Sequence, residues 1–461
     1  MEIESTLKYA EEHREEFVEE LIELLKIPSV SAKPDHQEHI LDMADQVREM
    51  LKALGMKTQR FDEGMHPLLY GEWMNAPGRP TVLFYGHYDV QPPEPLELWD
   101  SGPFEPRIED GKIYARGASD DKGQFMTHLK AIEAFQETHG ALPVNVKVLI
   151  EGEEEIGSPT LMPFVAEHTD LLRCDCAVIS DGSMWADGVP ALCYGLRGLA
   201  TMDVEVRGPN RDIHSGVYGG IVPNPLNVLC DLIARLKDAE GRVAIPGFYD
   251  AVRPVEDWEK KQFAELNLDE QGLCKDLGLK TLDGEAGYAA LERQWARPTL
   301  DLNGIEGGYQ GPGPKTIIPS FARAKISMRL VPNQDPKAIT EALEKYLESI
   351  CPESVELQME LHAGSPAVSL SPFGPVMDTA KEAFREGFGR EVVFIREGAS
   401  VPVVGAFSRQ LDVPCVMYGF GLQDDRLHSP NEKFNLEHFH GGIRTIIHFL
   451  QLLGGLGEKE L

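Results

Sequence analysis

The sequence is short of positive charge, of closely paired cysteines and of long apolar runs. Its 44 lysines and arginines are outnumbered by 75 aspartates and glutamates, which gives a formal net charge of −31 at pH 7. An acidic surface repels phosphate groups, so neither nucleic acid nor an anionic membrane is expected as a partner. A well-solvated surface is the simplest explanation of the acidity, and salt adaptation stays open as an alternative.

The seven cysteines are scattered, with no CxxC pair. This pattern indicates neither a disulfide framework nor a thiolate zinc site. The charged N-terminal stretch MEIESTLKYAEEHREE lacks the apolar segment of a signal peptide. No apolar run approaches the roughly 18 residues that a membrane helix needs. We therefore expect a reduced, cytoplasmic protein.

The chain of 461 residues is longer than one hydrophobic core usually covers, so two domains are expected. Up to residue 197, strands alternate with helices, which is typical of a doubly wound, mostly parallel α/β sheet. From 198 to 365 the order becomes βαββαβ, the ferredoxin-like arrangement. We predict a catalytic α/β domain formed by 1–197 and 366–461, split by an inserted α+β domain at 198–365.

The segment 81–89, TVLFYGHYD, is where the sequence first indicates chemistry. Strand-like residues 81–85 are followed by His87 and Asp89. In open α/β sheets, ligands bind beyond the carboxyl ends of the strands. Neutral imidazole is a common metal ligand, and a carboxylate often accepts its second ring N–H. His-x-Asp also arises often by chance, so a metal site is indicated only if further ligands reach the same edge.

Other predicted strands, and one loop before a helix, also lead into carboxylate or histidine side chains. These are Glu154 and Glu155 after strand 144–150, Asp181 after strand 176–179, His428 after strand 413–418, and Asp120 in the loop before a helix. Such nitrogen and oxygen ligands suit zinc, manganese or cobalt. Packing these groups together without a cation would cost heavily in repulsion and desolvation. The sequence therefore predicts a metal centre at this edge.

Five ligands suit two metal ions that share one carboxylate. Two ions roughly 3.5–4 Å apart can hold a bridging hydroxide and polarise a carbonyl. In the pair Glu154-Glu155, one side chain can bind metal while the other stays free as a general base. A dinuclear hydrolytic centre is therefore the predicted chemistry.

Motifs along nearly the whole chain carry a family resemblance. They are GHYDVQPP (86–93), Trp99 with DSGPF (100–104), DGKIYARGASDDKGQ (110–124), EGEEEIGSP (151–159), SDG (180–182), HSG (214–216), GIEGGYQGPGPKTIIP (304–319), RLVPNQ (329–334) and LHSPNE (427–432). Their order resembles the co-catalytic metallopeptidases that include carnosinase and the cytosolic nonspecific dipeptidases. Aminoacylase, succinyl-diaminopimelate desuccinylase and glutamate carboxypeptidase are relatives. The resemblance is closest to the dipeptidase branch.

The resemblance implies a role for each ligand. His87 and Asp181 would bind one metal ion, Glu155 and His428 would bind the other, and Asp120 would bridge the two. The peptide bond after Asp120 is cis in relatives. Zinc is the expected metal, with manganese and cobalt as alternatives.

Two further residues of the same region have implied roles. Asp89 would orient His87. Glu154 would be the base that takes a proton from the attacking water and gives it to the leaving amine.

The inserted domain is implied to serve as a lid and to form a homodimer. His214 resembles a histidine that reaches the partner subunit's active site and stabilises the oxyanion. Arg329 and Thr316 match positions that bind the substrate's free carboxylate, for which the planar guanidinium is suited. Ser400 matches a third substrate contact, although Gly398-Ala399-Ser400 stands where relatives often have Gly-Gly-Ser.

The predicted function is hydrolysis of dipeptides that have a free C-terminal carboxylate. The nearest alternative is an N-acyl-amino-acid deacylase with the same dinuclear site, because both reactions hydrolyse an amide. A non-catalytic, metal-stabilised dimeric binding protein is a third hypothesis, which the presence of Glu154 argues against.

Overall fold

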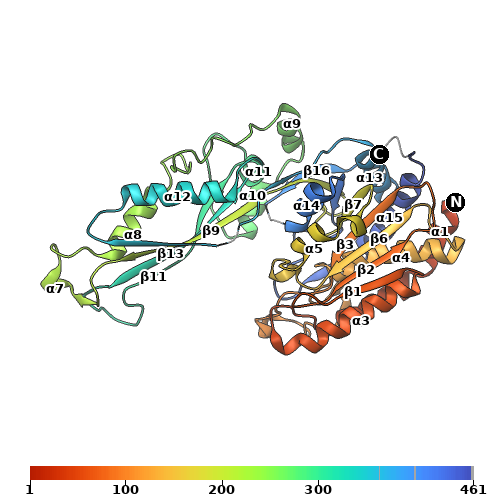
Figure 1. The fold of residues 1–461 in the computed structure, drawn as a ribbon, viewed down its shortest axis with the longest axis horizontal. Helices are drawn as coiled ribbons and strands as arrows, with labels where there is room; N and C mark the ends of the chain where they lie inside the picture. The colour runs from red at the N-terminus through yellow and green to blue at the C-terminus, as the bar shows by residue number, and fades with distance from the viewer. Residues whose placement is uncertain (363, 399–400, 458–461) are drawn as a thin grey trace. The chain divides into compact units, whose positions relative to one another are not determined.

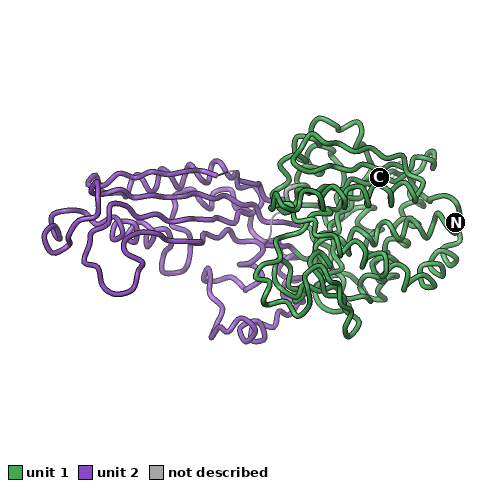
Figure 2. The backbone as a smooth tube through the Cα atoms, turned by 90° about the horizontal axis from the view of Figure 1, so that it is seen from below, with its two compact units in different colours: residues 1–194, 370–395, 401–461 green, residues 195–369, 396–400 purple. Residues whose placement is uncertain are grey.

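The chain folds into two compact units (Figure 2), each with its own hydrophobic core. Unit 1 comprises Met1–Tyr194, Leu370–Ile395 and Val401–Leu461, and unit 2 comprises Gly195–Ser369 and Arg396–Ser400. The structure, a computed structural model, describes residues 1–362, 364–398 and 401–457.

Unit 1 is built on a mixed sheet whose central strands are parallel. The order from one edge is β1-β2-β6-β3-β7-β17-β8, and β15 and β16 also pair with β8. The pairs β6–β3, β3–β7 and β7–β17 are parallel, whereas β1, β2 and β8 run antiparallel to their neighbours. The strands are β1 (Lys57–Phe61), β2 (Leu68–Trp73), β3 (Thr81–His87), β6 (Asn145–Glu151), β7 (Cys176–Ile179), β8 (Ala191–Leu196), β16 (Val393–Glu397) and β17 (Cys415–Tyr418). The short strand β15 (Val368–Ser369) pairs with the last two residues of β8, and all four residues belong to unit 2. The predicted α/β class with a mostly parallel central sheet is confirmed.

Helical segments cover both faces of this sheet (Figure 1). Side chains alternate between the two faces along a strand. Phe84 of β3 packs against His128 of α4 on one face, and Tyr85 packs against Phe407, just after α14, on the other. The helices of unit 1 are α1 (Ile3–Glu12), α2 (Arg14–Leu25), α3 (Gln37–Ala53), α4 (Lys122–His139), α5 (Leu161–Glu167), α6 (Thr169–Leu172), α13 (Pro375–Phe388), α14 (Pro402–Ala406) and α15 (Leu436–Leu453). Within the described residues, no helix is both long and apolar enough to cross a membrane.

Strand β3 shows how the sequence positions the site. Every residue from Val82 to His87 is buried. Parallel strands that are covered on both faces need continuous apolar runs, which is what this strand has. The strand therefore delivers His87, its last residue, to the carboxyl edge of the sheet.

Unit 2 contains a four-stranded antiparallel sheet in the order β11-β13-β9-β14. Along the chain the elements are β9 (Gly198–Arg207), α8 (Pro225–Ala234), β11 (Thr299–Gly307), β13 (Phe321–Leu330), α12 (Pro336–Ile350) and β14 (Glu356–Leu361). This is the expected βαββαβ order of a ferredoxin-like fold. Between α8 and β11 lie the short helices α9 (Asp257–Glu265), α10 (Glu270–Asp276) and α11 (Ala290–Trp295).

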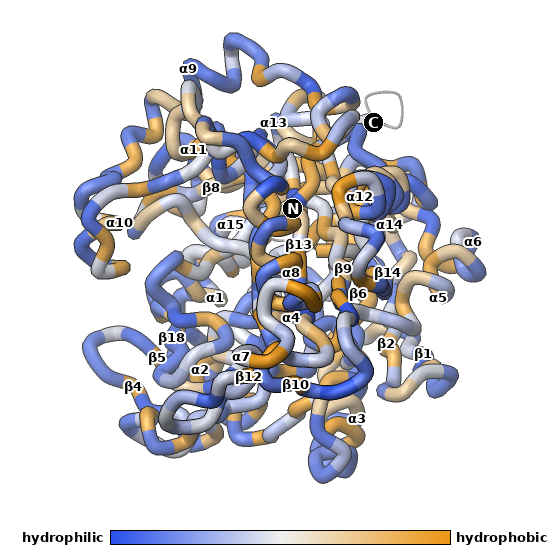
Figure 3. Tube along the Cα trace, turned by 90° about the vertical axis from the view of Figure 1, so that its left-hand side faces the viewer, coloured by the Kyte–Doolittle hydropathy of each residue, from blue (hydrophilic) through white to orange (hydrophobic). Residues whose placement is uncertain are grey.

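The core of unit 2 lies between this sheet and helices α8 and α12. Buried and partly exposed residues alternate along β13, so that Ile326, Met328 and Leu330 face the core. Leu343 and Leu347 of α12 belong to the same core. Apolar and polar residues alternate along α12 (Figure 3), as expected of a helix with one buried face. The opposite face of β13 carries mostly polar side chains, among them Arg323, Lys325 and Arg329.

Candidate metal centre

The carboxyl edge of the parallel strands gathers the predicted ligands. His87 ends β3, and Asp181 lies just beyond β7. Glu154 and Glu155 lie just beyond β6, in a helical turn. Because β6, β3 and β7 are adjacent and parallel, these side chains reach the same edge of the sheet.

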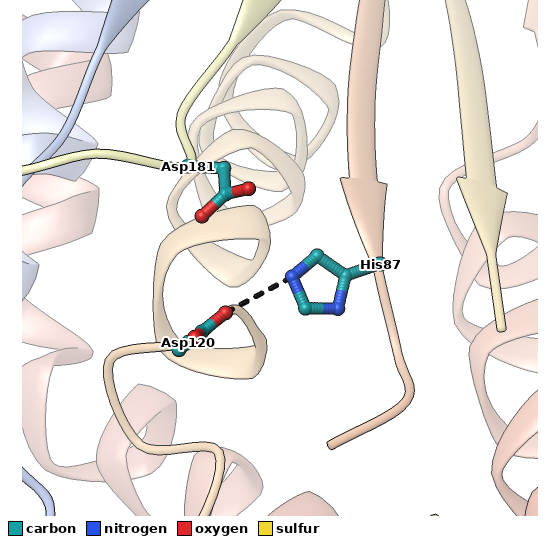
Figure 4. Close-up of side chains that lie close together, drawn as sticks. All are labelled: His87, Asp120 and Asp181. Carbon is teal, nitrogen blue, oxygen red and sulfur yellow. Dashed lines mark hydrogen bonds and ion pairs between the residues drawn. The ribbon is translucent and has the colours of Figure 1, made fainter. Parts of the chain in front are cut away.

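One group of three potential ligands consists of His87, Asp120 and Asp181 (Figure 4). One donor atom from each lies within 4.8 Å of the others. His87 Nε2 is 3.1 Å from Asp120 Oδ1, and the His87 side chain is fully buried. We call this group the buried triad.

A second group consists of Asp120, Glu155 and His428, and its donor atoms also lie within 4.8 Å of one another. His428 Nε2 is 3.0 Å from Asp120 Oδ2 and 3.3 Å from Glu155 Oε2. The side chain of His428 is 56% exposed, so we call this group the open triad. Asp120 directs one carboxylate oxygen to each triad, which is the geometry of a bridging ligand.

Asp89 contacts both the histidine and the loop that carries the glutamates. His87 Nδ1 lies 3.1 Å from the Asp89 carbonyl oxygen and 3.4 Å from Asp89 Oδ1. Either acceptor keeps the ring proton on Nδ1 and leaves Nε2 for a metal. The Asp89 carboxylate also accepts hydrogen bonds from the backbone N–H groups of Glu154 and Glu155, at 3.2 and 3.1 Å. The structure thus gives Asp89 a second contact that the sequence did not predict.

Burial and mutual repulsion of the carboxylates in this cluster favour the binding of a cation. Burial, together with neighbouring carboxylates, raises the pKa of Glu154 to about 9, of Glu155 to about 7 and of Asp181 to about 6. Burial opposes ionisation of Asp120 as well, but hydrogen bonds with the two histidines hold the pKa of this carboxyl below its ordinary range. A bound divalent cation reverses this local field and favours the ionised ligands. The residues present therefore fit a divalent metal such as zinc, manganese or cobalt.

Two residues of the quoted motifs support the ligands without having been predicted to do so. The Gln91 side-chain amide donates to Glu155 Oε2 at 2.8 Å. Asp121 Oδ2 accepts a hydrogen bond from the His87 backbone N–H at 3.1 Å. The Asp120–Asp121 peptide bond is cis, as the resemblance implied. Gln91 lies in the motif GHYDVQPP and Asp121 in SDDKG, each within four positions of a predicted ligand. That closeness in sequence is the signal by which these two supporting residues could have been found.

The other predicted site residues belong to unit 2 or lie outside the described part of the chain. His214 pairs with Ile317 between the short strands β10 (Ile213–His214) and β12 (Ile317–Ile318), which brings Thr316 close to it. The Thr316 carbonyl accepts a hydrogen bond from the Ser215 N–H at 3.0 Å. The His214 side chain is exposed, and its Nδ1 accepts a hydrogen bond from the Gly216 N–H.

Arg329 lies on the polar face of the sheet in unit 2. It stands opposite Thr299 in β11 and Leu199 in β9. Burial and the nearby positive charge of Arg329 lower the pKa of Arg197 to about 10. Ser400 lies outside the residues that the structure describes.

Comparison with known proteins adds to this geometry. Residues 83–452 match the sequence pattern of "Peptidase family M20/M25/M40". The chain is 33% identical over 470 residues to the Cys-Gly metallodipeptidase dug1 of Schizosaccharomyces pombe, an alignment that covers 98% of each protein. Its fold is similar to the crystal structure of human carnosine dipeptidase 1, with a TM-score of 0.85, 31% identity and 99% of each chain covered. It is also similar to the M20 family metallo-carboxypeptidase Sso-CP2 from Sulfolobus solfataricus, with a TM-score of 0.85 and 34% identity over 96% of this chain and 100% of that one.

The match covers most of the chain, and the relatives align with it from end to end. The predicted resemblance to the carnosinase and dipeptidase group is confirmed. The chain belongs to peptidase family M20/M25/M40 and is a hydrolase related to the metallodipeptidases of that family.

Proposed function

We propose that this protein is a metal-dependent dipeptidase that hydrolyses dipeptides with a free C-terminal carboxylate. The observation that carries the proposal is the pair of triads that share Asp120, with Glu154 next to Glu155 in the same helical turn. The similarity to proteins named as dipeptidases supports the substrate class.

The two triads would hold two divalent ions, for which zinc is the expected identity. His87 and Asp181 would serve one ion, Glu155 and His428 the other, and Asp120 both. Ions bound there polarise a substrate carbonyl and lower the pKa of a coordinated water.

Glu154 is the proposed general base. It is not a member of either triad, so its carboxylate stays available for proton transfer. Burial raises the pKa of Glu154 to about 9, and the positive charge of bound cations would favour its ionised form. In this role the carboxylate takes a proton from water and later donates it to the nitrogen of the leaving amine.

We propose that unit 2 serves as the inserted domain expected at 198–365 and provides substrate recognition and a dimer contact. Arg329 and Thr316 would bind the free carboxylate, with Ser400 as a third contact, and His214 would stabilise the oxyanion in the partner subunit. These roles rest on the resemblance. A homodimer that acts on small peptides in the cytoplasm is the state that this proposal predicts.

A second candidate is removal of C-terminal residues from longer peptides. The similarity to a metallo-carboxypeptidase, at 34% identity, favours it. Both activities need a carboxylate anchor and the same metal centre, so substrate length separates them. The deacylase alternative is not favoured by the dipeptidase relatives.

The test is the variant Glu154→Gln. We expect a loss of roughly 10²–10⁴-fold in kcat on Ala-Gly, because the amide cannot accept the proton, with an unchanged metal content. Retained turnover would reject the assignment of Glu154. The same assay with two further substrates separates the candidate activities. Hydrolysis of N-acetyl-alanine would indicate a deacylase, and hydrolysis of a tetrapeptide with a blocked N-terminus and a free C-terminal carboxylate would indicate a carboxypeptidase.

A matched control is Glu151→Gln, a buried carboxyl three residues earlier. Its Oε1 accepts hydrogen bonds from Tyr85 and Ser158, and burial raises the pKa of Glu151 to about 8. An amide oxygen can accept the same bonds as the neutral acid. We therefore expect this variant to retain activity, which would show that the loss in Glu154→Gln is specific.

A further inference from the structure

Two buried carboxylates flank His428 along the chain, and neither has a role in the chemistry proposed above. Asp425 and Glu432 are both fully buried. Both contact the loop 116–120, which ends in the shared ligand Asp120. The segment that carries one ligand of the open triad is therefore fixed to the loop that carries another.

Glu432 accepts four hydrogen bonds from that loop. Its Oε2 accepts from Arg116 Nη1 at 2.7 Å and from the Gly117 N–H at 3.0 Å. Its Oε1 accepts from the N–H groups of Ser119 and Asp120, at 3.0 and 3.1 Å. Since both oxygens are used twice, the carboxylate fixes the backbone of the loop up to the ligand itself.

Asp425 holds the same loop from the other side. Its Oδ2 accepts from the Ser119 hydroxyl at 3.2 Å and from the Leu422 N–H at 2.6 Å. Its Oδ1 accepts from Lys433 Nζ at 2.5 Å. The Lys433 N–H also donates to the Asp425 carbonyl, which closes the segment around His428.

Apart from the shared ligand Asp120, the contacts of Glu432 and Asp425 concern the open triad and not the buried one. Among the described residues, the hydrogen bonds of Glu432 and Asp425 involve the Asp120 loop and the His428 segment, and none involves His87 or Asp181. The His428 side chain is largely exposed, so little packing fixes its position. The buried triad, by contrast, includes His87, which the fully buried β3 holds.

We propose that Glu432 and Asp425 are positioning residues that set the geometry of the open triad and thereby the affinity of the metal ion bound there. The inference rests on the proposed dinuclear hydrolase. Partners that orient metal ligands typically change metal affinity by about 10–100-fold when they are removed. Glu432, with four donors from one loop, is such a partner. In Glu432→Gln, the side-chain NH₂ group would face two of the N–H donors that now bond to a carboxylate oxygen.

The experiment is zinc titration of the metal-free, full-length Glu432→Gln variant by calorimetry. We expect two ions to bind the unchanged protein, and one of them to bind about 10–100-fold more weakly in the variant. His428→Ala identifies that ion: in the double variant, Glu432→Gln should add little further loss, because the site it supports is already broken. Excess zinc should restore the kcat of Glu432→Gln but not that of Glu154→Gln.

A matched control is Glu285→Gln in unit 2. Glu285 is buried and makes two hydrogen bonds with Arg297, at 2.6 and 2.7 Å, so its loss tests the general cost of breaking a buried ion pair. We expect it to leave both zinc affinities unchanged. Unchanged zinc affinities in Glu432→Gln, or equal weakening in the Glu285 control, would overturn the inference.

A milder variant keeps the inference testable if Glu432→Gln does not fold, as judged by circular dichroism. Ser119→Ala removes only the hydroxyl bond to Asp425, and we expect the same ion to weaken about fivefold. Normal affinity in that variant would count against the inference. If the unchanged protein binds two ions but hydrolyses no peptide, the proposed function fails while the affinities still decide the role of Glu432.

Discussion

The metal centre of unit 1 and the sheet of unit 2 place their charged side chains differently. In unit 1, His87 and Asp89 at the metal centre are fully buried, whereas His428 of the open triad is 56% exposed. In unit 2, charged residues such as Arg323 and Lys325 occupy the polar face of a sheet whose other face is apolar. Across β13 and β9, the Arg323 side chain, which is 43% exposed, pairs with the more buried Glu205.

This difference in the burial of charged groups shows where a functional site lowers the stability of the fold. A buried carboxylate must be compensated by hydrogen bonds or by a cation, whereas a partly solvated one needs neither. Burial raises the pKa of Glu154, Glu155 and Asp181 in unit 1. Because their ionised forms are disfavoured without a cation, we expect a divalent ion to bind in unit 1.

The largest expected effect comes from removing the shared ligand. Asp120→Ala takes one oxygen from each triad, so both zinc ions should be lost in metal analysis. Turnover of Ala-Gly should fall by more than the roughly 10²–10⁴-fold expected for loss of the base, because the base then has no activated water. Asp203→Ala, on the polar face of unit 2 where it contacts His362, is the matched carboxylate control. Full metal content in Asp120→Ala, or metal loss in the control, would break the comparison.

The sequence was informative where local pattern sets the structure. The apolar run of β3 followed by His87 predicted a strand end with a ligand, and the order of elements in unit 2 predicted its topology. The antiparallel strands β1, β2 and β8 were not predicted, because their pairing depends on neighbours distant in the chain.

The supporting residues of the metal centre show the same limit. Glu432 lies in the quoted motif LHSPNE, yet its partners are backbone N–H groups more than 300 positions earlier, such as that of Ser119. Because backbone N–H groups are the same in every residue type except proline, a carboxylate that accepts from them cannot be recognised from the sequence around it. The second contact of Asp89, with the Glu154–Glu155 loop, was missed for the same reason.

A smaller effect is expected at Arg329, where unit 2 is proposed to contribute to catalysis through binding. Loss of a charge-assisted hydrogen bond to a substrate carboxylate costs about 1.5–3 kcal/mol. Arg329→Ala should therefore lower kcat/KM for Ala-Gly by about 10–100-fold, mainly through KM, since the contact exists in both ground and transition states. Arg329→Lys should recover only part of this, because an ammonium lacks the bidentate geometry.

Arg323→Ala is the control for Arg329, since it alters the same face of the same strand. We expect its kcat/KM to match that of the unchanged protein in steady-state assays. If KM were insensitive to Arg329, or equally sensitive to both arginines, the polar face of unit 2 would have no specific part in carboxylate recognition.

The smallest expected effect is on the pH dependence of stability, and it comes from a buried titratable group of unit 1 away from the metal centre. His128 packs against Phe84 inside the core, and its Nε2 is 3.4 Å from the Tyr418 hydroxyl. Burial lowers the pKa of His128 to about 3, whereas an unfolded histidine titrates near 6.5. Below about pH 6.5, His128 therefore binds a proton in the unfolded chain but not in the folded protein, so stability falls as the pH falls. The slope is at most about 1.4 kcal/mol per pH unit.

His128→Gln should remove this contribution, which urea unfolding of the metal-free protein between pH 7 and pH 5 would measure. Glu154, Glu155 and Asp181 act in the opposite direction, because their raised pKa values make stability fall as the pH rises. The difference between the variant and the unchanged protein isolates His128 from them. If the free energy of unfolding had the same pH dependence in His128→Gln and in the unchanged protein, His128 would be protonated in the folded core of unit 1. The contrast between the units would then be confined to the metal centre.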